Sequence, residues 1–185
     1  MKNISNKALL IIDIQNDYFK DGAMELVGAK QASENAKLIL EKFRNEKSPI
    51  IHIQHIAGGK EATFFLPNTK GAEIHYNVQP KDNEKVIVKH NPNSFRETEL
   101  LEYLISNDIS ELVICGMMTH MCVDTTTRAA YDLGFMCTLI GDACATKDLE
   151  FDAMKVNSNE VQISYMAALD GTFADVKFTE EYLNG

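Results

Sequence analysis

The sequence predicts an α/β fold, in which a mostly parallel central sheet lies between two layers of helices as a three-layer sandwich. Short apolar runs typical of strands alternate along the chain with longer segments of helical periodicity, and this alternation favours parallel strands. The first run, ALLIIDI at 8–14, is nearly continuous in apolar residues, as expected for a strand covered by helices on each side. With 185 residues and no repeat or long linker, the chain is expected to form one domain spanning 1–185.

Each expected element follows from its own periodicity and length. Apolar residues recur at helical spacing over 31–45, whereas PIIHIQ at 49–54 and KVIVK at 85–89 have the length and β-branched content of strands. The full set, in chain order, is a strand at 8–14, a helix at 31–45, strands at 49–54 and 85–89, a helix at 98–107, a strand at 112–115 ended by Gly116, a helix capped by Thr119 and closed by Gly134, a strand at 135–140, a helix at 159–170 and a short strand at 172–176. The weakly periodic stretch 56–78 is expected to be a long loop that shapes the substrate site or contacts another subunit.

The charge and the cysteine content exclude some partners and settings. A formal net charge of −9 argues against nucleic acid or an anionic membrane as the main partner. The four cysteines form no CxxC pair and no zinc-finger spacing, and no leader or membrane-spanning run is visible, so we expect a cytoplasmic protein with free thiols. Two of the thiols, Cys137 in a strand and Cys144 in a loop, are expected to pack rather than react.

Three chemically distinct side chains are expected at one edge of the predicted sheet. Asp13 lies near the end of the first strand, Lys89 ends the KVIVK strand, and Cys122 follows the LVIC strand. The carboxyl ends of parallel strands meet at one edge, where ligands bind in such folds. A carboxylate or an ammonium is costly to bury alone, so we interpret Asp13 and Lys89 as partners near Cys122. The alternative is that each is structural: a strand-end cap, or a small cysteine that packs a strand–helix junction.

The expected position of Cys122 suits a nucleophile. Near the third residue of a helix, unpaired N–H groups and the positive end of the helix dipole lower the pKa of a thiol. The same N–H groups can receive the oxyanion of an acyl-transfer intermediate. An adjacent carboxylate can accept the thiol proton, and an adjacent ammonium can stabilise the thiolate. Asp13, Lys89 and Cys122 together therefore predict nucleophilic catalysis.

Motifs spread over nearly the whole chain carry a family resemblance. They are DIQNDYF at 13–19, NSF at 93–95 beyond Lys89, GMMTHMCVDTTTRAA at 116–130, DA at 142–143 and AALDGTFADV at 167–176. In this order they resemble the isochorismatase-like cysteine hydrolases, a superfamily that includes nicotinamidase and N-carbamoylsarcosine amidohydrolase. The resemblance implies an isochorismatase-like, Rossmann-like fold, no cofactor, and a homo-oligomer of two or more copies.

The resemblance also implies roles for individual residues. Cys122 would be the nucleophile, Asp13 the acid and base, and Lys89 their electrostatic partner. A cis peptide bond between Met117 and Met118 would aim the amides of Met118 and Cys122 at the substrate oxygen. A cysteine at position 122 places the chain with the amidase-type branch, because true isochorismatases use a different residue there.

The stretch HIQHIAGG departs from the family pattern. Nicotinamidases carry an Asp-x-His metal site after the second strand, but here His55 and Ala57 stand at those positions. His52 and His55 are an odd number apart, so they point to opposite faces of one strand, and we expect no metal. His55 alone is a candidate pocket residue, and so are three others: Gln15, Phe19 and Phe95.

These observations predict a cysteine-dependent hydrolase that acts on a small molecule. The expected reaction is cleavage of a C–N bond in a small amide or carbamoyl compound through a thioester intermediate. Three alternatives stay open: an isochorismatase-type hydrolase of an ether or ester, a thiol redox or sensor protein, and a non-enzymatic binding module, against which the intact Asp13, Lys89 and Cys122 argue. The sequence does not separate nicotinamide-like rings from aliphatic amides or ureido acids.

Overall fold

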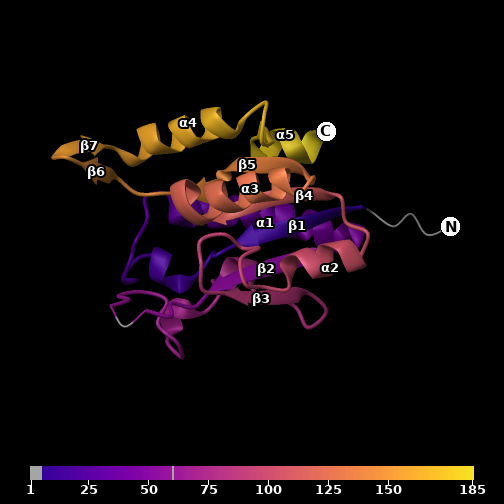
Figure 1. Cartoon of the computed structure of the whole chain (residues 1–185), viewed down its shortest axis with the longest axis horizontal. Helices are drawn as coiled ribbons and strands as arrows, with labels where there is room; N and C mark the ends of the chain where they lie inside the picture. Colours follow the sequence, from indigo (N-terminus) through magenta and orange to yellow (C-terminus); the bar gives the residue numbers. More distant parts are fainter. Residues whose placement is uncertain (1–5, 60) are drawn as a thin grey trace.

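A computed structural model describes residues 6–59 and 61–185, and its centre is a six-stranded sheet with all strand pairs parallel (Figure 1). The strand order is β3-β2-β1-β4-β5-β8. The strands are β1 (Lys7–Ile12), β2 (Ile50–His55), β3 (Lys85–Lys89), β4 (Glu111–Met117), β5 (Met136–Ala145) and β8 (Asp175–Lys177). The predicted α/β class, with a mostly parallel central sheet, is confirmed.

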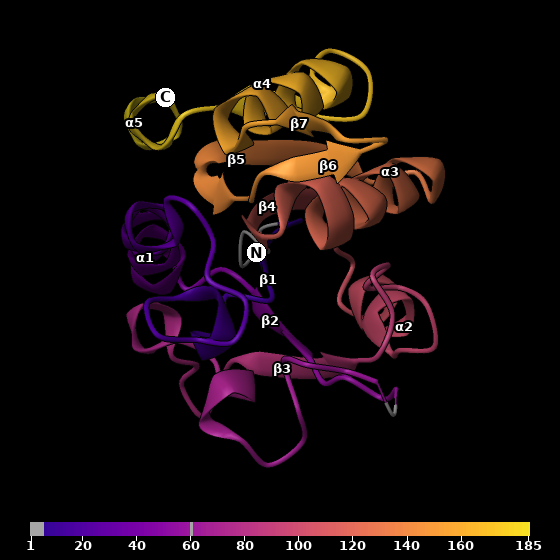
Figure 2. The same cartoon turned by 90° about the vertical axis from the view of Figure 1, so that its left-hand side faces the viewer.

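Helices cover both faces of this sheet (Figure 2). The helices are α1 (Ala29–Glu46), α2 (Leu100–Ser106), α3 (Asp124–Asp132), α4 (Ser158–Leu169) and α5 (Thr179–Asn184). One buried cluster joins α1 to one set of strand side chains, including Leu9 and Ile11, while a second joins α2 and α3 to the alternate set, including Leu10 and Ile12. Alternation along β1 thus places successive side chains in opposite cores, which explains its continuous apolar run.

Three elements, two short strands and the last helix, were not expected from the sequence. A short antiparallel hairpin of β6 (Leu149–Phe151) and β7 (Met154–Val156) projects beside α4, and α5 follows β8 (Figure 1). Strand β5 is also longer than predicted and includes Cys144, so the expectation that Cys144 lies in a loop is wrong. Its thiol is buried, as a packing role requires.

Gly116 does not end β4, as the sequence suggested, but lies within it and pairs with Ile12 of β1. Its φ of 142° is a conformation that side-chain-bearing residues rarely adopt. A β-carbon at Gly116 would also overlap the carbonyl oxygen of Ile12. Only glycine therefore lets β4 approach β1 this closely just before the chain turns into the candidate site.

A buried ionic cluster links α1 to the end of the sheet at which the strands begin. Arg44 holds Glu84 through two hydrogen bonds, Nε to Oε1 at 2.7 Å and Nη2 to Oε2 at 3.0 Å. The ring of His52 lies 2.9 Å from the same carboxylate, and the backbone N–H of Lys81 donates to it. His52 is thus committed to a structural cluster, away from the edge at which His55 lies.

Replacing Glu84 with glutamine is expected to lower the free energy of unfolding by about 3 kcal/mol, because Arg44 would stay partly buried without its anion. Burial opposes ionisation of Glu84, but Arg44, Lys81 and His52 outweigh it and lower its pKa from 4.5 to about 2. The stabilisation should therefore be complete above the unfolded-state pKa and be lost as the pH falls toward 2. Urea unfolding at neutral and acidic pH measures both effects; an equal difference at every pH would contradict this account.

Among the described residues, no helix is both long and apolar enough to cross a membrane.

Candidate active site

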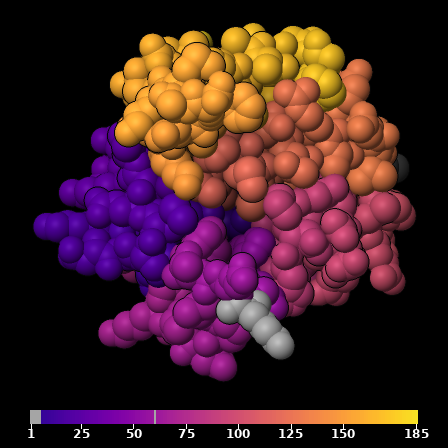
Figure 3. Space-filling model, turned by 60° about the vertical axis from the view of Figure 1, so that its left-hand side comes forward, coloured from indigo at the N-terminus to yellow at the C-terminus, as the bar shows by residue number. Residues whose placement is uncertain are grey.

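The three predicted catalytic side chains meet at the carboxyl edge of the sheet. Asp13 directly follows β1, Lys89 is the last residue of β3, and Cys122 lies in the helical turn Thr119–Val123 after β4. All three are buried, with Asp13 and Lys89 fully enclosed. Figures 2 and 3 bring this edge toward the viewer, and in Figure 3 the N-terminal, middle and later segments of the chain meet around a hollow.

The ammonium of Lys89 links the other two groups. Its Nζ lies 2.7 Å from Oδ2 of Asp13 and 3.1 Å from Sγ of Cys122. Among the described residues, neither Oδ1 nor Oδ2 of Asp13 has a hydrogen-bond partner although both are buried, and Oδ2 is ion-paired with Lys89. The site therefore combines a thiol, a cation beside it and a carboxylate oxygen that is free to accept a proton.

The electrostatics of the site favour a protonated resting thiol. Burial raises the pKa of Cys122 well above its usual range, the charge of Asp13 raises it further, and Lys89 opposes both. Burial raises the pKa of Asp13 against the opposing pull of Lys89. Burial alone would lower the pKa of Lys89, but the charges of Asp13 and Cys122 raise it overall. The expectation of a lowered pKa at Cys122 is therefore wrong, and proton transfer must generate the thiolate.

The turn that carries Cys122 differs from the expected helix start. Residues Thr119–Val123 form a π-helical turn, and α3 begins only at Asp124. Thr119 is not the N-cap, because its hydroxyl is directed to Gln162 Oε1 at 2.7 Å and lies 3.2 Å from Ala145 O. Single π-helical turns recur at functional sites, where they re-aim one side chain out of the regular helical register. The peptide bond between Met117 and Met118, which leads into this turn, is cis.

Gln15 holds the loop that covers the site. Its amide nitrogen donates to the carbonyls of His55 and Ala72, and its amide oxygen accepts from the N–H of His55 at 2.7 Å. Asp17 adds a second attachment, since its carboxylate accepts the N–H of Phe65 at 2.6 Å. A β-carbon at Gly71 would overlap that carboxylate, so a larger residue there would displace Asp17 from the N–H of Phe65. The predicted substrate contact at Gln15 is thus, in the structure, an attachment of the 56–78 loop to the end of β1.

Aromatic side chains lie along the same loop. Tyr18 is buried and packs edge-on against Phe65 at 4.7 Å between ring centroids, and Phe65 in turn lies 5.9 Å from the ring of His55. Burial raises the pKa of Tyr18, and the charges of Asp13 and Cys122 raise it further. The sequence analysis missed Tyr18; the DIQNDYF motif was its only signal.

The two predicted pocket phenylalanines lie in other surroundings. Phe19 stacks on His75 with 3.6 Å between centroids, beside a surface pocket that includes Asn16 and Tyr76. Phe95 packs against Phe135, with 6.1 Å between centroids, in the core under α2 and α3. The structure therefore brings His55 to Lys89, as described below, while Phe95 packs against the buried cluster that includes Cys122.

Asp13, His55 and Cys122 offer ligand atoms that lie within 4.8 Å of one another, a spacing that a metal ion could use. The ammonium of Lys89, however, is within hydrogen-bond distance of all three groups. A metal cation bound by the same atoms would lie next to this ammonium and be repelled by it. These donors thus fit a site organised around a lysine, and we retain the expectation of no metal.

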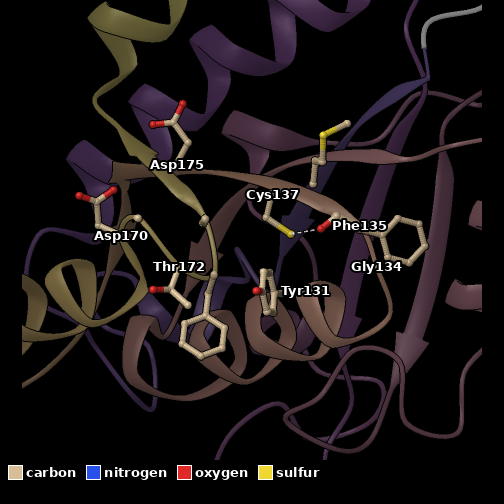
Figure 4. A pocket seen from close by; sticks show the side chains of 11 residues that line it. Tyr131, Gly134, Phe135, Cys137, Asp170, Thr172 and Asp175 are labelled. Carbon is tan, nitrogen blue, oxygen red and sulfur yellow. Dashed lines mark hydrogen bonds between the residues drawn. The ribbon is translucent and has the colours of Figure 1, made fainter.

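A pocket of about 470 Å³ lies at the opposite edge of the sheet, where β5 and β8 begin (Figure 4). It is lined by Tyr131, Cys137, Asp170, Thr172 and Asp175 among others, and the thiol of Cys137 points to the carbonyl of Phe135. None of the predicted catalytic residues lines it. This pocket is therefore separate from the candidate active site.

The sheet order, together with a carboxylate, an ammonium and a thiol at the carboxyl edge, defines an α/β protein of the isochorismatase-like class. The chain belongs to the isochorismatase family of hydrolases, whose Isochorismatase domain model matches residues 7–167. The superfamily inferred from the motifs is confirmed.

Known relatives place the chain within this family. It is 49% identical over 176 residues to the uncharacterized isochorismatase family protein YddQ of Bacillus subtilis, covering 95% of this chain and 98% of that protein. Streptothricin hydrolase of Streptomyces noursei is 32% identical over 143 residues, with 77% of this chain and 51% of that protein covered. A crystal structure from Oleispira antarctica, described as an isochorismatase hydrolase, matches with a TM-score of 0.95 and 44% identity over 100% of both chains.

Proposed function

We propose that the protein is a cysteine-dependent hydrolase that cleaves a C–N bond of a small amide or carbamoyl compound through a thioester. The observation that carries the proposal is the position of Lys89, whose ammonium lies within hydrogen-bond distance of both the Asp13 carboxylate and the Cys122 thiol. The three groups are buried together, so their interactions are weakly screened by solvent.

In the first step Asp13 takes the proton of Cys122, and the thiolate attacks the substrate carbonyl carbon. The free oxygen Oδ1 of Asp13 is the proposed acceptor. Lys89 compensates the negative charge as it moves from carboxylate to sulfur. We assign the backbone N–H groups of Met118 and Cys122 to the oxyanion, since Cys122 lies in the π-helical turn Thr119–Val123 and Met118 directly precedes it.

In the second step the C–N bond breaks and the leaving nitrogen takes the proton from Asp13, so that ammonia or an amine departs and a thioester remains on Cys122. Water then attacks the thioester carbonyl while Asp13 accepts its proton. Collapse of this intermediate releases the acid, and the proton returns from Asp13 to the sulfur. Every proton is accounted for by Asp13, so the cycle requires no cofactor.

A specific acid–base pair is needed for this chemistry but not for redox sensing. The oxidation of a sensor cysteine depends on a stable, exposed thiolate, whereas Cys122 is buried and its pKa is raised. Of the alternatives, cleavage of an ester or ether in the same site fits these observations better than redox sensing does. Streptothricin hydrolase, one of the named relatives, supports hydrolysis in general. The expected homo-oligomer and cytoplasmic setting stay predictions.

The bond that is cleaved can be tested by a matched substrate panel. We expect purified protein to release ammonia or amine from one or more small amides or carbamoyl compounds, and to do so faster than it hydrolyses esters or vinyl ethers of similar shape. The panel should pair each aromatic amide with an aliphatic one, since the ring of Phe65 packs against Tyr18 and lies 5.9 Å from the ring of His55. Turnover of vinyl ethers with no amide turnover would replace the proposal with the isochorismatase-type alternative.

A further inference from the structure

The buried ammonium of Lys89 is surrounded by more hydrogen-bond acceptors than it has N–H groups to donate. Besides Asp13 and Cys122, its Nζ lies 3.1 Å from Nδ1 of His55 and 3.1 Å from the carbonyl oxygen of Asn91. An ammonium donates three hydrogen bonds and accepts none. Four acceptors thus compete for three N–H groups, and two of them, His55 and the Asn91 carbonyl, carry no charge.

The tautomer of the His55 ring follows from its contact with Lys89. Because Lys89 can only donate, Nδ1 of His55 must accept, and the proton of the neutral ring sits on Nε2. Burial lowers the pKa of His55 to about 4, and the charges of Lys89 and His90 contribute to the decrease. The ring therefore stays neutral through the pH range in which Asp13 and Cys122 exchange a proton.

Hydrogen bonds fix the backbone of His55 as well as its ring. It ends β2 directly opposite Lys89 of β3, in parallel register. Its N–H and its carbonyl both bond to the Gln15 side chain, at 2.7 and 2.8 Å, and the next N–H, of Ile56, donates to the Lys89 carbonyl. The imidazole is thus a fixed acceptor beside a long, otherwise flexible lysine side chain.

We propose that His55 is a positioning residue for Lys89: together with the Asn91 carbonyl it forms a neutral two-point anchor, while the remaining N–H of the ammonium alternates between Asp13 and Cys122. This inference rests on the proposed function. In the resting site the carboxylate is the nearer and the charged partner, with Oδ2 at 2.7 Å from Nζ against 3.1 Å for Sγ, so it attracts the ammonium more strongly. Once the thiol proton has moved to Asp13, the thiolate is the stronger acceptor, and the ammonium turns to it without being displaced.

Loss of the His55 anchor should shift the Lys89 ammonium toward the Asp13 carboxylate and away from Cys122. With His55 replaced by leucine, the ammonium has one neutral acceptor fewer and is drawn toward Asp13, its strongest partner. Asp13 then becomes a weaker base and Lys89 stabilises the thiolate less. We expect the rate at which Cys122 reacts with iodoacetamide at a fixed pH to fall about tenfold, the effect of one hydrogen bond to a charged group.

The experiment compares His55→Leu with His55→Asn in the full-length protein. The amide oxygen of asparagine can stand near the position of Nδ1, so this variant should recover most of the labelling rate. His90→Leu is the matched control, because His90 is an exposed neighbouring histidine whose ring bonds to Ile56 O and not to Lys89. Labelling of Cys122 is read by peptide mass spectrometry, with Cys137 as the internal reference and a thermal melt as the test of folding.

Two results would overturn the assignment. One is an unchanged Cys122 labelling rate in folded His55→Leu; the other is failure of His55→Asn to label faster than His55→Leu. Once an accepted amide is known, the same variants should lower kcat with little change in KM, whereas a substrate-binding role for His55 would raise KM. Labelling needs no substrate, so it stands apart from the proposed function, which fails if Cys122→Ala still hydrolyses the amide.

Discussion

Replacing Cys122 with alanine is expected to lower kcat for an accepted amide by about 10⁴-fold or more, because no other group can form the thioester. The residual rate would come from the oxyanion-binding amides and from substrate binding alone. The fold should tolerate the change, since only the small Cys122 side chain is lost and the Asp13–Lys89 ion pair remains in place. Removing a thiol with a raised pKa leaves no unpaired charge behind.

The measurement is a full rate curve for Cys122→Ala beside the wild type, with thermal melts of both. Cys137→Ala is the matched control, because that thiol belongs to β5 at the opposite edge and should keep wild-type kcat. If Cys122→Ala keeps more than about a tenth of wild-type kcat, the nucleophile is another group.

Replacing Asp13 with asparagine is expected to lower kcat by about 10² to 10⁴-fold, the range of general acid–base catalysis. Asparagine keeps the size of the side chain but cannot take the thiol proton. It also leaves the fully buried ammonium of Lys89 without its anion, so the free energy of unfolding should fall by about 3–5 kcal/mol. Rate curves and urea unfolding measure the two effects separately.

The pH dependence of kcat/KM separates a catalytic role of Asp13 from a purely structural one. Burial raises the pKa of Asp13 above the ordinary 3.8, so wild-type activity should fall as the pH drops through this raised value and the base becomes protonated. Asp13→Asn should lack that acid limb. An acid limb of unchanged midpoint in the variant would assign it to another group.

The sequence was sufficient to place the catalytic candidates on one edge of the sheet. Strand runs ended next to Asp13, at Lys89 and before Cys122, and the parallel topology then brought these ends together. Strand alternation also predicted that His52 and His55 point to opposite faces of the sheet. In the structure His52 contacts Glu84, whereas His55 contacts Lys89.

The remaining features depend on tertiary contacts that no local pattern carries. Thr119 has the residue type of an N-cap, but its hydroxyl is used by Ala145 and Gln162, which lie far along the chain. The raised pKa of Cys122 follows from the depth of burial and from the facing Asp13, which outweigh a position near a helix start. The hold of Gln15 on the loop likewise requires the folded position of Ala72.

The thioester is the central claim, and partition of the reaction between water and hydroxylamine tests it most directly. Two substrates with the same acyl group and different leaving groups, such as an amide and its anilide, are compared in the presence of hydroxylamine. A common thioester on Cys122 predicts the same ratio of hydroxamate to acid from both, because the leaving group has departed before the second nucleophile attacks. A ratio that changes with the leaving group would show direct attack by water and would contradict the account.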